Sequence, residues 1–493
     1  MSTRPRDPAS RLPIKLDSTS NGEFAPIPLD DSLRRANALA LASADEHAQR
    51  RGQSRRDFLV SACGAASTLL AFNRAHAAAG RSGGFFELPA AAALDPEIAA
   101  AELGKRELIV DVQGHFVNPT GAWLAKVPAD AKPLSEMPKA GCALGEAAGA
   151  GPRDYLQCLS GEQFIKDVFL DSDTDLMVLS FVPSPREREP LTIEEAVATR
   201  AIVEKMEGSH RLLLHARVNP NQPGDLEDMD RLAAFGVSAW KTYTQYGPEG
   251  KGFFMTDDAG VALCEKARKL GIKNIAIHKG LPFGRRSYEH STCSDIGPIA
   301  KRFPDLNFLI YHSGYVAGAE EGPHDPKRED GVDQLVTSLL EAGVKPGSNV
   351  YAELGSTWRF ASTRNPTHAA HVLGKLFKSC GADNVLWGTD SIWYGSPQDQ
   401  IQAFRTFQIA EDLRAKHGYP EITPDLRQKV FAQNAAKVYS LDLATLQKKA
   451  SNDAVAQDKL AYQERPDPSF LTYGPRTRRE LMNLLAWNGG RVS

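Results

Sequence analysis

The chain has 493 residues, of which 42% are hydrophobic and 24% are charged. This composition supports a sizeable core and excludes disordered, collagen-like and coiled-coil proteins. The formal net charge of −3 gives no basic excess for binding nucleic acid, and no apolar run reaches the roughly 18 residues that a membrane span needs.

An export-like sequence begins at residues 54–60. Arg55 and Arg56 stand before an apolar stretch that Gly, Ser and Thr dilute, and Ala75-His76-Ala77 follows as a small-x-small cleavage site. This order resembles a twin-arginine export signal. The alternative is a short core helix behind a disordered leader. The export hypothesis predicts cleavage after Ala77 and a periplasmic or secreted protein that the twin-arginine machinery exports in the folded state.

The cysteines leave the redox compartment open. Six in a chain of this length do not make a disulfide framework, and no CxxC pair indicates a zinc knuckle. Cys142 and Cys158 could pair in an oxidising compartment, whereas scattered cysteines are by default buried thiols.

Eight short apolar runs follow the first hundred residues, and helical patterns separate them. Each run is continuous rather than alternating, which is typical of strands buried on both faces. They span residues 107–116, 175–183, 211–220, 237–244, 272–280, 306–314, 349–356 and 384–391, and the helical patterns include 256–271, 332–343 and 366–381. This alternation predicts an α/β fold, a (β/α)8 TIM-type barrel, with a doubly wound open sheet as the competing hypothesis.

The barrel is expected over residues 108–444, with flanking segments of other kinds. We expect the export signal and its polar leader over 1–77 and a linker with one short helix over 78–107. An insertion over 117–153, rich in Pro, Ala and Gly, follows the first strand, where it would shape substrate access. A C-terminal helical extension over 445–493 would contact a second subunit or plug the barrel.

Polar residues stand at the ends of the predicted strands, where a barrel builds its active site. A lone histidine is more often structural, but three at converging positions, with a carboxylate after the last strand, favour a functional site. These residues are Gln113 and His115 after the first run, Lys241 in the fourth, His278 after the fifth, His312 after the sixth, Glu353 in the seventh and Asp390 after the eighth.

The motifs VDVQGHF, AIHKG, FLIYHSGY and VLWGTDS resemble those of the amidohydrolase superfamily, most closely its amidohydrolase-related branch. The resemblance covers about residues 108–441 and includes FAQNAAKVYSL at 431–441, which is similar to the family's terminal helix. That branch contains hydrolases, lactonases and decarboxylases that are similar to aminocarboxymuconate-semialdehyde decarboxylase. The resemblance implies a divalent metal, Zn²⁺ first and Mn²⁺ as the alternative. The implied ligands are His115, His278 and Asp390, and His312 would bind metal or assist catalysis.

One position departs from the family pattern. Gln113 stands where the family has the first histidine of a His-x-His pair, and an amide oxygen is a weaker zinc ligand than imidazole. Three outcomes stay open: a two-His-one-carboxylate site with Gln113 as a weak or outer ligand, a site rebuilt by Lys241 or Glu353, or a metal that is weakly held or absent. Lys241 could be carboxylated and bridge two metals, or it could pair with Glu353 or Asp390.

Two further residues are candidates for substrate contact. Arg217 ends the third strand and could bind a substrate carboxylate with two hydrogen bonds, or it could form a surface salt bridge. Trp393 follows Asp390 and could wall the pocket, or it could pack in the core.

These features predict an exported metal-dependent hydrolase that cleaves an amide, ester or lactone bond of a small organic acid. Water activated by the metal would attack, Asp390 would accept its proton, and His312 would position the carbonyl oxygen. Non-oxidative decarboxylation on the same site is one alternative, and a non-catalytic binding protein with a degraded metal site is another. The expected partners are a small-molecule substrate, the export machinery and, from the family alone, a second copy in a homodimer.

Overall fold

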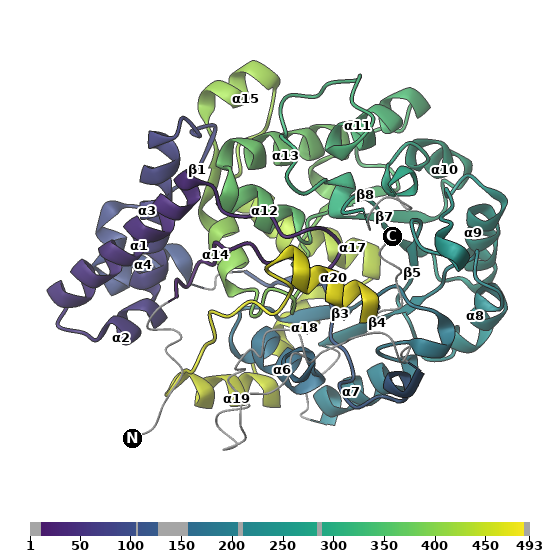
Figure 1. Ribbon diagram of the computed structural model, residues 1–493, viewed down its shortest axis with the longest axis horizontal. Helices are drawn as coiled ribbons and strands as arrows, with labels where there is room; N and C mark the ends of the chain where they lie inside the picture. Colours follow the sequence, from purple (N-terminus) through teal and green to yellow (C-terminus); the bar gives the residue numbers. More distant parts are fainter. Residues whose placement is uncertain (1–10, 105–106, 127–155, 206–210, 283–287, 488–493) are drawn as a thin grey trace.

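Eight parallel strands form a nearly closed barrel in this computed structural model, which describes residues 11–104, 107–126, 156–205, 211–282 and 288–487 (Figure 1). The strands are paired in chain order, β2 to β9. The backbone N–H of Val112 donates to Trp387 O at 3.0 Å, and a bridge joins Gly114 to Ser391, so the first strand meets the end of the last. The barrel prediction is therefore confirmed.

The eight predicted strands are all present, each within its apolar run. Their bounds are β2 (Val110–Gly114), β3 (Leu176–Leu179), β4 (Leu212–Arg217), β5 (Ala239–Tyr243), β6 (Asn274–His278), β7 (Asn307–Tyr311), β8 (Val350–Glu353) and β9 (Val385–Leu386).

Helices surround the barrel and cover the outward faces of the strands (Figure 1). The patterns at 256–271, 332–343 and 366–381 correspond to α9 (Asp258–Leu270), α11 (Gly331–Ala342) and α13 (Pro366–Ser379). The other helices around the barrel are α6 (Gly161–Ile165), α7 (Ile193–Lys205), α8 (Asp225–Ala233), α10 (Ile296–Arg302), α12 (Thr357–Arg364), α14 (Gln398–Thr406), α15 (Glu411–His417), α16 (Pro424–Gln428) and α17 (Asn434–Tyr439).

The half of the barrel interior at the amino ends of the strands is apolar and closed. Val112, Val178 and Leu309 pack there with Val438 and Tyr439 of α17. His215, inside β4, donates or accepts a hydrogen bond with the Tyr439 hydroxyl at 3.0 Å and serves this packing. Polar chemistry is consequently confined to the opposite end, where the strands terminate at their carboxyl ends.

Residues 31–103 fold against one side of the barrel. They form α1 (Asp31–Arg50), α2 (Arg55–Val60), α3 (Ala62–Ala78), β1 (Gly84–Phe86) and α4 (Pro96–Leu103). Strand β1 pairs antiparallel with β10 (Phe407–Ile409) of the barrel region, so the predicted linker contributes a strand. The export signal and its cleavage stay predictions, but the residues that carry them are folded here.

Small residues let α1 and α3 pack closely. Helix α1 buries Ala36, Ala40 and Ala44 at a spacing of four, so a smooth stripe faces α3. A Cβ on Gly64 would stand 2.4 Å from Phe58 O, so only glycine fits the close turn between α2 and α3. Packing thus accounts for Gly64, one of the residues that dilute the apolar stretch.

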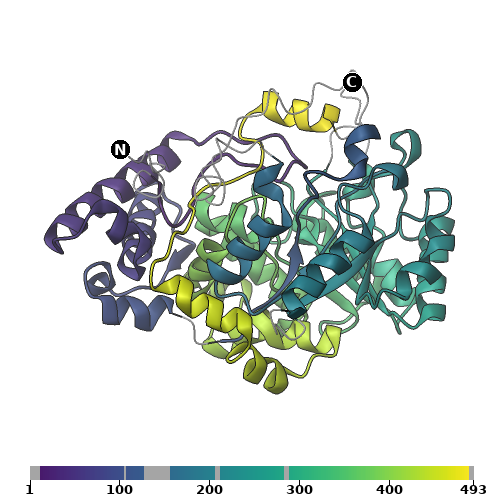
Figure 2. The same ribbon diagram turned by 90° about the horizontal axis from the view of Figure 1, so that it is seen from below.

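The chain between residues 11 and 30 leaves these helices and runs over the barrel mouth. Figures 1 and 2 show this dark purple segment on the same face as the yellow helix α20 (Arg478–Trp487), whereas α18 (Leu443–Ala450) lies on the opposite side. The C-terminal extension also contains α19 (Ala454–Gln463), so its described part holds three helices. Most of the predicted 117–153 insertion lies outside the described residues. Among the described helices, none has the length and apolar character that a membrane span requires.

Candidate active site

Asp390 is the centre of a hydrogen-bonded cluster at the carboxyl end of the barrel. Its Oδ1 accepts from Gln113 Nε2 at 3.0 Å and lies 3.1 Å from His115 Nε2. Its Oδ2 accepts from Asn21 Nδ2 at 2.8 Å and from the Ser356 hydroxyl. The barrel therefore brings the first-strand residues and the last-strand carboxylate together, as the sequence predicted.

Two more histidines lie beside this cluster. The ring centroids of His278 and His312 are 4.6 Å apart, and His312 Nε2 lies 3.4 Å from Gln113 Nε2. A carboxylate from the N-terminal segment faces both rings: Glu23 Oε1 is 3.3 Å from His278 Nδ1, and Glu23 Oε2 is 3.7 Å from His312 Nε2. Glu23, His278 and His312 form a group whose ligand atoms lie within 4.8 Å of one another.

Each of these imidazoles has one ring nitrogen turned to a backbone carbonyl. His115 Nδ1 donates to Ser180 O at 2.8 Å, His312 Nδ1 to Gly355 O at 2.7 Å, and His278 Nε2 to Gly280 O at 3.2 Å. Since a carbonyl only accepts, these contacts fix the tautomers of the neutral His278 and His312 rings. The other nitrogen of each of these two rings then directs a lone pair at a Glu23 oxygen, so a proton or a cation must stand between them. Metal-ligating histidines in proteins have this arrangement.

Burial sets the protonation of these groups. It lowers the pKa of His312 to about 4 and that of His278 well below its ordinary value, so both rings are neutral at pH 7. Burial, and then the charge of Asp390, raises the pKa of Glu23 well above its usual range. Burial alone would also raise the pKa of Asp390, but the hydrogen bond and charge of His115 hold it below its ordinary value. Neutral imidazoles beside crowded carboxyl groups are a donor set that fits a divalent cation.

Gln113 stands where these groups converge. Its amide nitrogen approaches His115, His312 and Asp390 at 3.0–3.4 Å, while its buried Oε1 has no hydrogen-bond partner among the described residues. Rotation about the terminal bond would exchange the two atoms and turn the oxygen to the centre. Gln113 can therefore serve as the weak ligand that the sequence allowed, and an orphaned buried oxygen supports that role.

Glu353 holds the backbone of the site. Its two carboxylate oxygens accept from the N–H groups of His312 at 3.0 Å and Gly355 at 2.5 Å. A Cβ on Gly388 would stand 1.6 Å from Glu353 Oε1, so glycine is required beside it. Burial raises the pKa of Glu353 to about 8. This geometry makes Glu353 a residue that positions His312, a role that was not considered from the sequence.

Lys241 projects from β5 into the barrel without a hydrogen-bond partner for Nζ among the described residues. Its ammonium lies 3.7 Å from the ring centroid of Tyr311 and 4.7 Å from that of Tyr243, which are cation–π contacts. Burial lowers the pKa of Lys241 to about 7. A buried, fully enclosed amine of this kind can receive an anionic group of a ligand.

The backbone at the strand ends is strained. Just beyond the described strands, five residues other than glycine have positive φ, namely Leu281 (38°), His312 (65°), Ser313 (52°), Ser356 (55°) and Asp390 (60°). Such conformations cost of order 1–3 kcal/mol each and cluster at functional sites. The rest of the fold therefore holds these residues in place although their backbone conformation is unfavourable in free energy.

The part of the site that the barrel supplies is buried. Its residues with at most 2% exposure include Gln113, His115, Lys241, His278, His312, Glu353 and Asp390. The Glu23 side chain, from the N-terminal segment, is 11% exposed. Trp393 stacks on His115 with a centroid separation of 5.7 Å and forms part of the wall.

Arg217 is not part of this cluster. Its guanidinium donates to Glu189 Oε1 at 2.7 Å and to Asp225 Oδ2 at 2.8 Å, within a buried ion-pair group. This arrangement resembles the salt bridge considered from the sequence, although the group is buried rather than on the surface.

Sequence reasoning missed three polar side chains of the site. Ser356 lies just beyond β8, within three residues of Glu353, and a search of that strand end would have found it. Asn21 and Glu23 belong to the segment interpreted as a leader. Their Asn-Gly turn is visible in the sequence, but no local pattern shows where the turn is bound.

Comparison with known proteins agrees with the motifs. The family model described as Amidohydrolase matches residues 110–441. No curated protein matches the chain in sequence.

Solved structures similar to the chain include 2,6-dihydroxybenzoate decarboxylase from Rhizobium, at 16% identity over 68% of this chain and 100% of that one, with a TM-score of 0.39. A Pseudomonas putida protein bearing the name 2-pyrone-4,6-dicarboxylic acid hydrolase has 15% identity over 69% and 100%, with a TM-score of 0.37. A 5-carboxyvanillate decarboxylase from Novosphingobium aromaticivorans with bound manganese has 15% identity over 68% and 97%, with a TM-score of 0.41.

Proposed function

Because the chain belongs to the amidohydrolase family, we propose that it is a metal-dependent hydrolase acting on a small organic acid. The bond cleaved is an amide, ester or lactone. The observation that carries this proposal is Asp390, whose pKa is held below its ordinary value while it contacts His115 in a buried site. An ionised carboxylate in that position can accept a proton from water during attack on a carbonyl carbon.

The residues that would hold the metal are His115, His278 and Asp390, with Gln113 beside them. His115 Nε2 lies 3.1 Å from Asp390 Oδ1, and zinc and manganese both accept imidazole and carboxylate ligands. The metal would act as a Lewis acid and lower the pKa of water in the site. Zinc is the first candidate and manganese the second.

The remaining polar groups would position the substrate. His312 stands beside Gln113 at 3.4 Å, close enough to contact a carbonyl oxygen held in the centre. The Lys241 ammonium, enclosed and without a hydrogen bond, would receive the substrate's carboxylate. Trp393 would pack against an apolar part of the substrate.

The test combines metal analysis with one isosteric variant. The purified full chain is assayed for metal content and for hydrolysis of a panel of amides, esters and lactones of small carboxylic acids. Asp390→Asn should lower turnover by about 10²- to 10⁴-fold while leaving the fold intact. The matched control is Asp305→Asn, an exposed carboxylate paired with Arg268, which should change nothing. Unchanged turnover in Asp390→Asn would refute the proposed base, and absence of both metal and turnover would favour a binding protein.

Non-oxidative decarboxylation is the second candidate, and the burial of Glu353 supports it. In that reaction the carbon–carbon bond to the carboxylate breaks, CO₂ leaves, and a proton takes its place on carbon. Glu353, whose pKa is raised to about 8 by burial, can hold a proton at neutral pH. Release of CO₂ from aromatic acids, lost in Glu353→Gln, would select this reaction over hydrolysis.

Export by the twin-arginine route is a separate proposal. It is supported by the Arg55-Arg56 motif and by Cys158, which is disulfide-bonded and so suits an oxidising compartment. Fractionation of producing cells should show that changing Arg55 and Arg56 together to Lys retains the protein inside. The matched control changes the neighbouring pair Arg50 and Arg51 to Lys. Equal distribution of both variants would contradict export by this route. A homodimer also stays a prediction.

A further inference from the structure

We propose that residues 11–30 are a permanent part of the metal centre and that Glu23 is one of its ligands. The inference rests on the proposed metal-dependent function and deepens it, because it adds a ligand that the family pattern does not contain. It also predicts that the active enzyme keeps a segment which the export hypothesis removes.

The geometry of Glu23 is that of a ligand. Its two oxygens face ring nitrogens of His278 and His312 at 3.3 and 3.7 Å. Both rings are held from behind by the carbonyls of Gly280 and Gly355, so each directs a lone pair at the Glu23 carboxylate. A cation placed between them would have two imidazoles and one carboxylate as ligands, so this inference makes His312 a ligand as well as a group beside the substrate.

Asn21 joins Glu23 to the rest of the site. Its side-chain nitrogen donates to Glu23 Oε2 and, at 2.8 Å, to Asp390 Oδ2, while its Oδ1 accepts from the Glu23 backbone at 3.0 Å. One amide therefore holds two carboxylates near each other. Carboxylates so placed in a buried site repel unless a proton or a cation is shared.

Burial and charge pairing anchor the segment to the barrel. Lys15 is 5% exposed; its Nζ donates to the carbonyls of Tyr394 and Ser396 at 2.6 and 2.7 Å and pairs with Asp399 at 3.5 Å. Asp17 pairs with Arg359 at 3.0 Å. These are contacts of an integral element, because buried charges are tolerated only where partners are built for them.

The segment also fits the C-terminal extension closely. Thr19 and Thr472 share a hydroxyl–hydroxyl bond of 2.6 Å, and Ser20 N donates to Pro475 O at 2.9 Å. A Cβ on Gly474 would stand 1.7 Å from Ser20 O, so glycine alone admits this approach. Two segments from opposite ends of the chain thus close the mouth together.

Glu23 compensates for the departure at Gln113. The neutral amide is a weak ligand, and it leaves the first-strand side of the centre short of one strong donor. Glu23 supplies a carboxylate from the opposite side. The metal would then be held by groups from both the barrel and the N-terminal segment.

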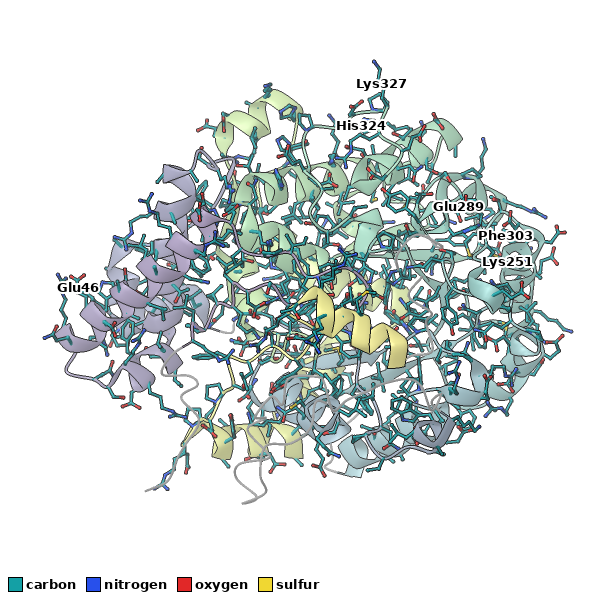
Figure 3. All side chains as sticks on the ribbon, in the orientation of Figure 1. Glu46, Lys251, Glu289, Phe303, His324 and Lys327 are labelled. Carbon is teal, nitrogen blue, oxygen red and sulfur yellow. The ribbon has the colours of Figure 1, made fainter. Side chains whose placement is uncertain are left out.

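The test is zinc binding by Glu23→Gln in the full chain. Stripped protein is titrated with zinc alone against a chromophoric chelator, and bound metal is counted by elemental analysis. We expect the zinc affinity to fall by at least about 10-fold, the smaller end of what an outer partner costs, because a direct ligand is lost. The matched control is Glu46→Gln, the same change at the outer edge of α1 (Figure 3), which should bind as the unaltered chain does.

Glu23→Asp guards against a folding artefact. It keeps the charge and should retain more affinity than Glu23→Gln, whereas a purely structural defect would not follow the charge. Thermal unfolding of the metal-free variants should match that of the metal-free parent. Zinc affinity that is unchanged in Glu23→Gln would overturn the proposal, and so would a variant that keeps zinc and turns over faster, since the segment would then be an occluding plug.

Mass spectrometry tests the retention of the segment. The zinc-bearing fraction from producing cells should contain the peptide with Asn21 and Glu23, and a metal-loaded species that begins at residue 78 would overturn the inference. Zinc binding that depends on Glu23, in a protein that hydrolyses nothing, would refute the proposed hydrolase while the ligand assignment stands.

Discussion

The barrel and the N-terminal region differ in how their sequences relate to their structures. The barrel repeats one unit eight times, and each strand is buried by its neighbours in the chain. The segment over residues 11–30 has no such neighbours: Lys15, Asp17 and Thr19 bind residues between about 340 and 460 positions away. Local sequence patterns predict the barrel, but they do not predict where the N-terminal segment binds.

The two regions also differ in what they give to the site. The barrel supplies His115, His278, His312 and Asp390 at fixed strand ends. The N-terminal region supplies Glu23 through a docked turn. If the N-terminal region and the barrel form one cooperative unit, they unfold together. If the N-terminal region is only loosely attached, it unfolds before the barrel does.

The largest expected effect separates these cases. Phe72 is fully buried in α3, so Phe72→Ala should lower the free energy of unfolding by about 3–5 kcal/mol. Denaturant unfolding should remain a single transition with a lower midpoint, because α3 and the barrel form one unit. The comparison variant is Phe308→Ala in β7, also fully buried. A separate early transition in Phe72→Ala, with the barrel transition unmoved, would show two independent units.

The second largest expected effect is a loss of stability at acid pH. Burial lowers the pKa of His76 in α3 to about 4, and Nε2 contacts Thr363 O at 3.0 Å. Between pH 6.5 and 4 the unfolded state therefore binds more protons than the folded state. The contribution of buried, neutral His76 to the free energy of unfolding is complete above pH 6.5 and is lost as the pH falls to 4. At about 1.4 kcal/mol per pH unit, the loss of stability is about 3.5 kcal/mol.

Hydrogen exchange of the α3 amides measures that loss. Protection should fall across this pH window in the unaltered chain and change less in His76→Gln, in which no imidazole titrates. Equal pH dependence in the two proteins would mean that His76 does not control the docking of α3.

The smallest of these effects concerns one close contact. Gly474→Ala would place a Cβ against Ser20 O and should cost about 1–3 kcal/mol as the backbone shifts. Because the N-terminal segment moves, zinc should also bind less tightly. Gly343→Ala is the control, since nothing lies within 4 Å of its Cβ and only its positive φ is unfavourable. A stability loss with unchanged zinc binding would separate the closure of the mouth from the metal centre.

The fold could be predicted because its signals are local and repeated. Continuous apolar runs mark strands buried on both faces, and the runs at 272–280 and 306–314 end in His278 and His312 as a barrel site requires. Their convergence follows from parallel strands sharing one end. The barrel and the family could therefore be predicted from residues that stand in recognisable local patterns.

The rest of the site could not be predicted, for physical reasons. Glu23 follows Asn21-Gly22, a polar turn that looks like a leader, and its partners are defined only by the finished barrel. The apolar stretch over 62–78 has the composition of an export signal and of a helix that packs closely on alanines. Composition alone does not distinguish these two roles, whereas the contacts of Gly64 and His76 bear on them directly.

The long sequence separation between contacting residues also affects when the site can form during synthesis of the chain. Asn21 and Asp390 stand 369 positions apart, and Ser18 and Arg476 stand 458 apart. At a synthesis rate of about 5–20 residues per second, roughly 20 to 75 seconds pass between the appearance of Asn21 and that of Asp390. During that interval the early segment must stay available while the barrel forms beside it. The site at the carboxyl end of the barrel is thus one of the last parts of the protein to be completed, and a growing chain on the ribosome carries no finished site.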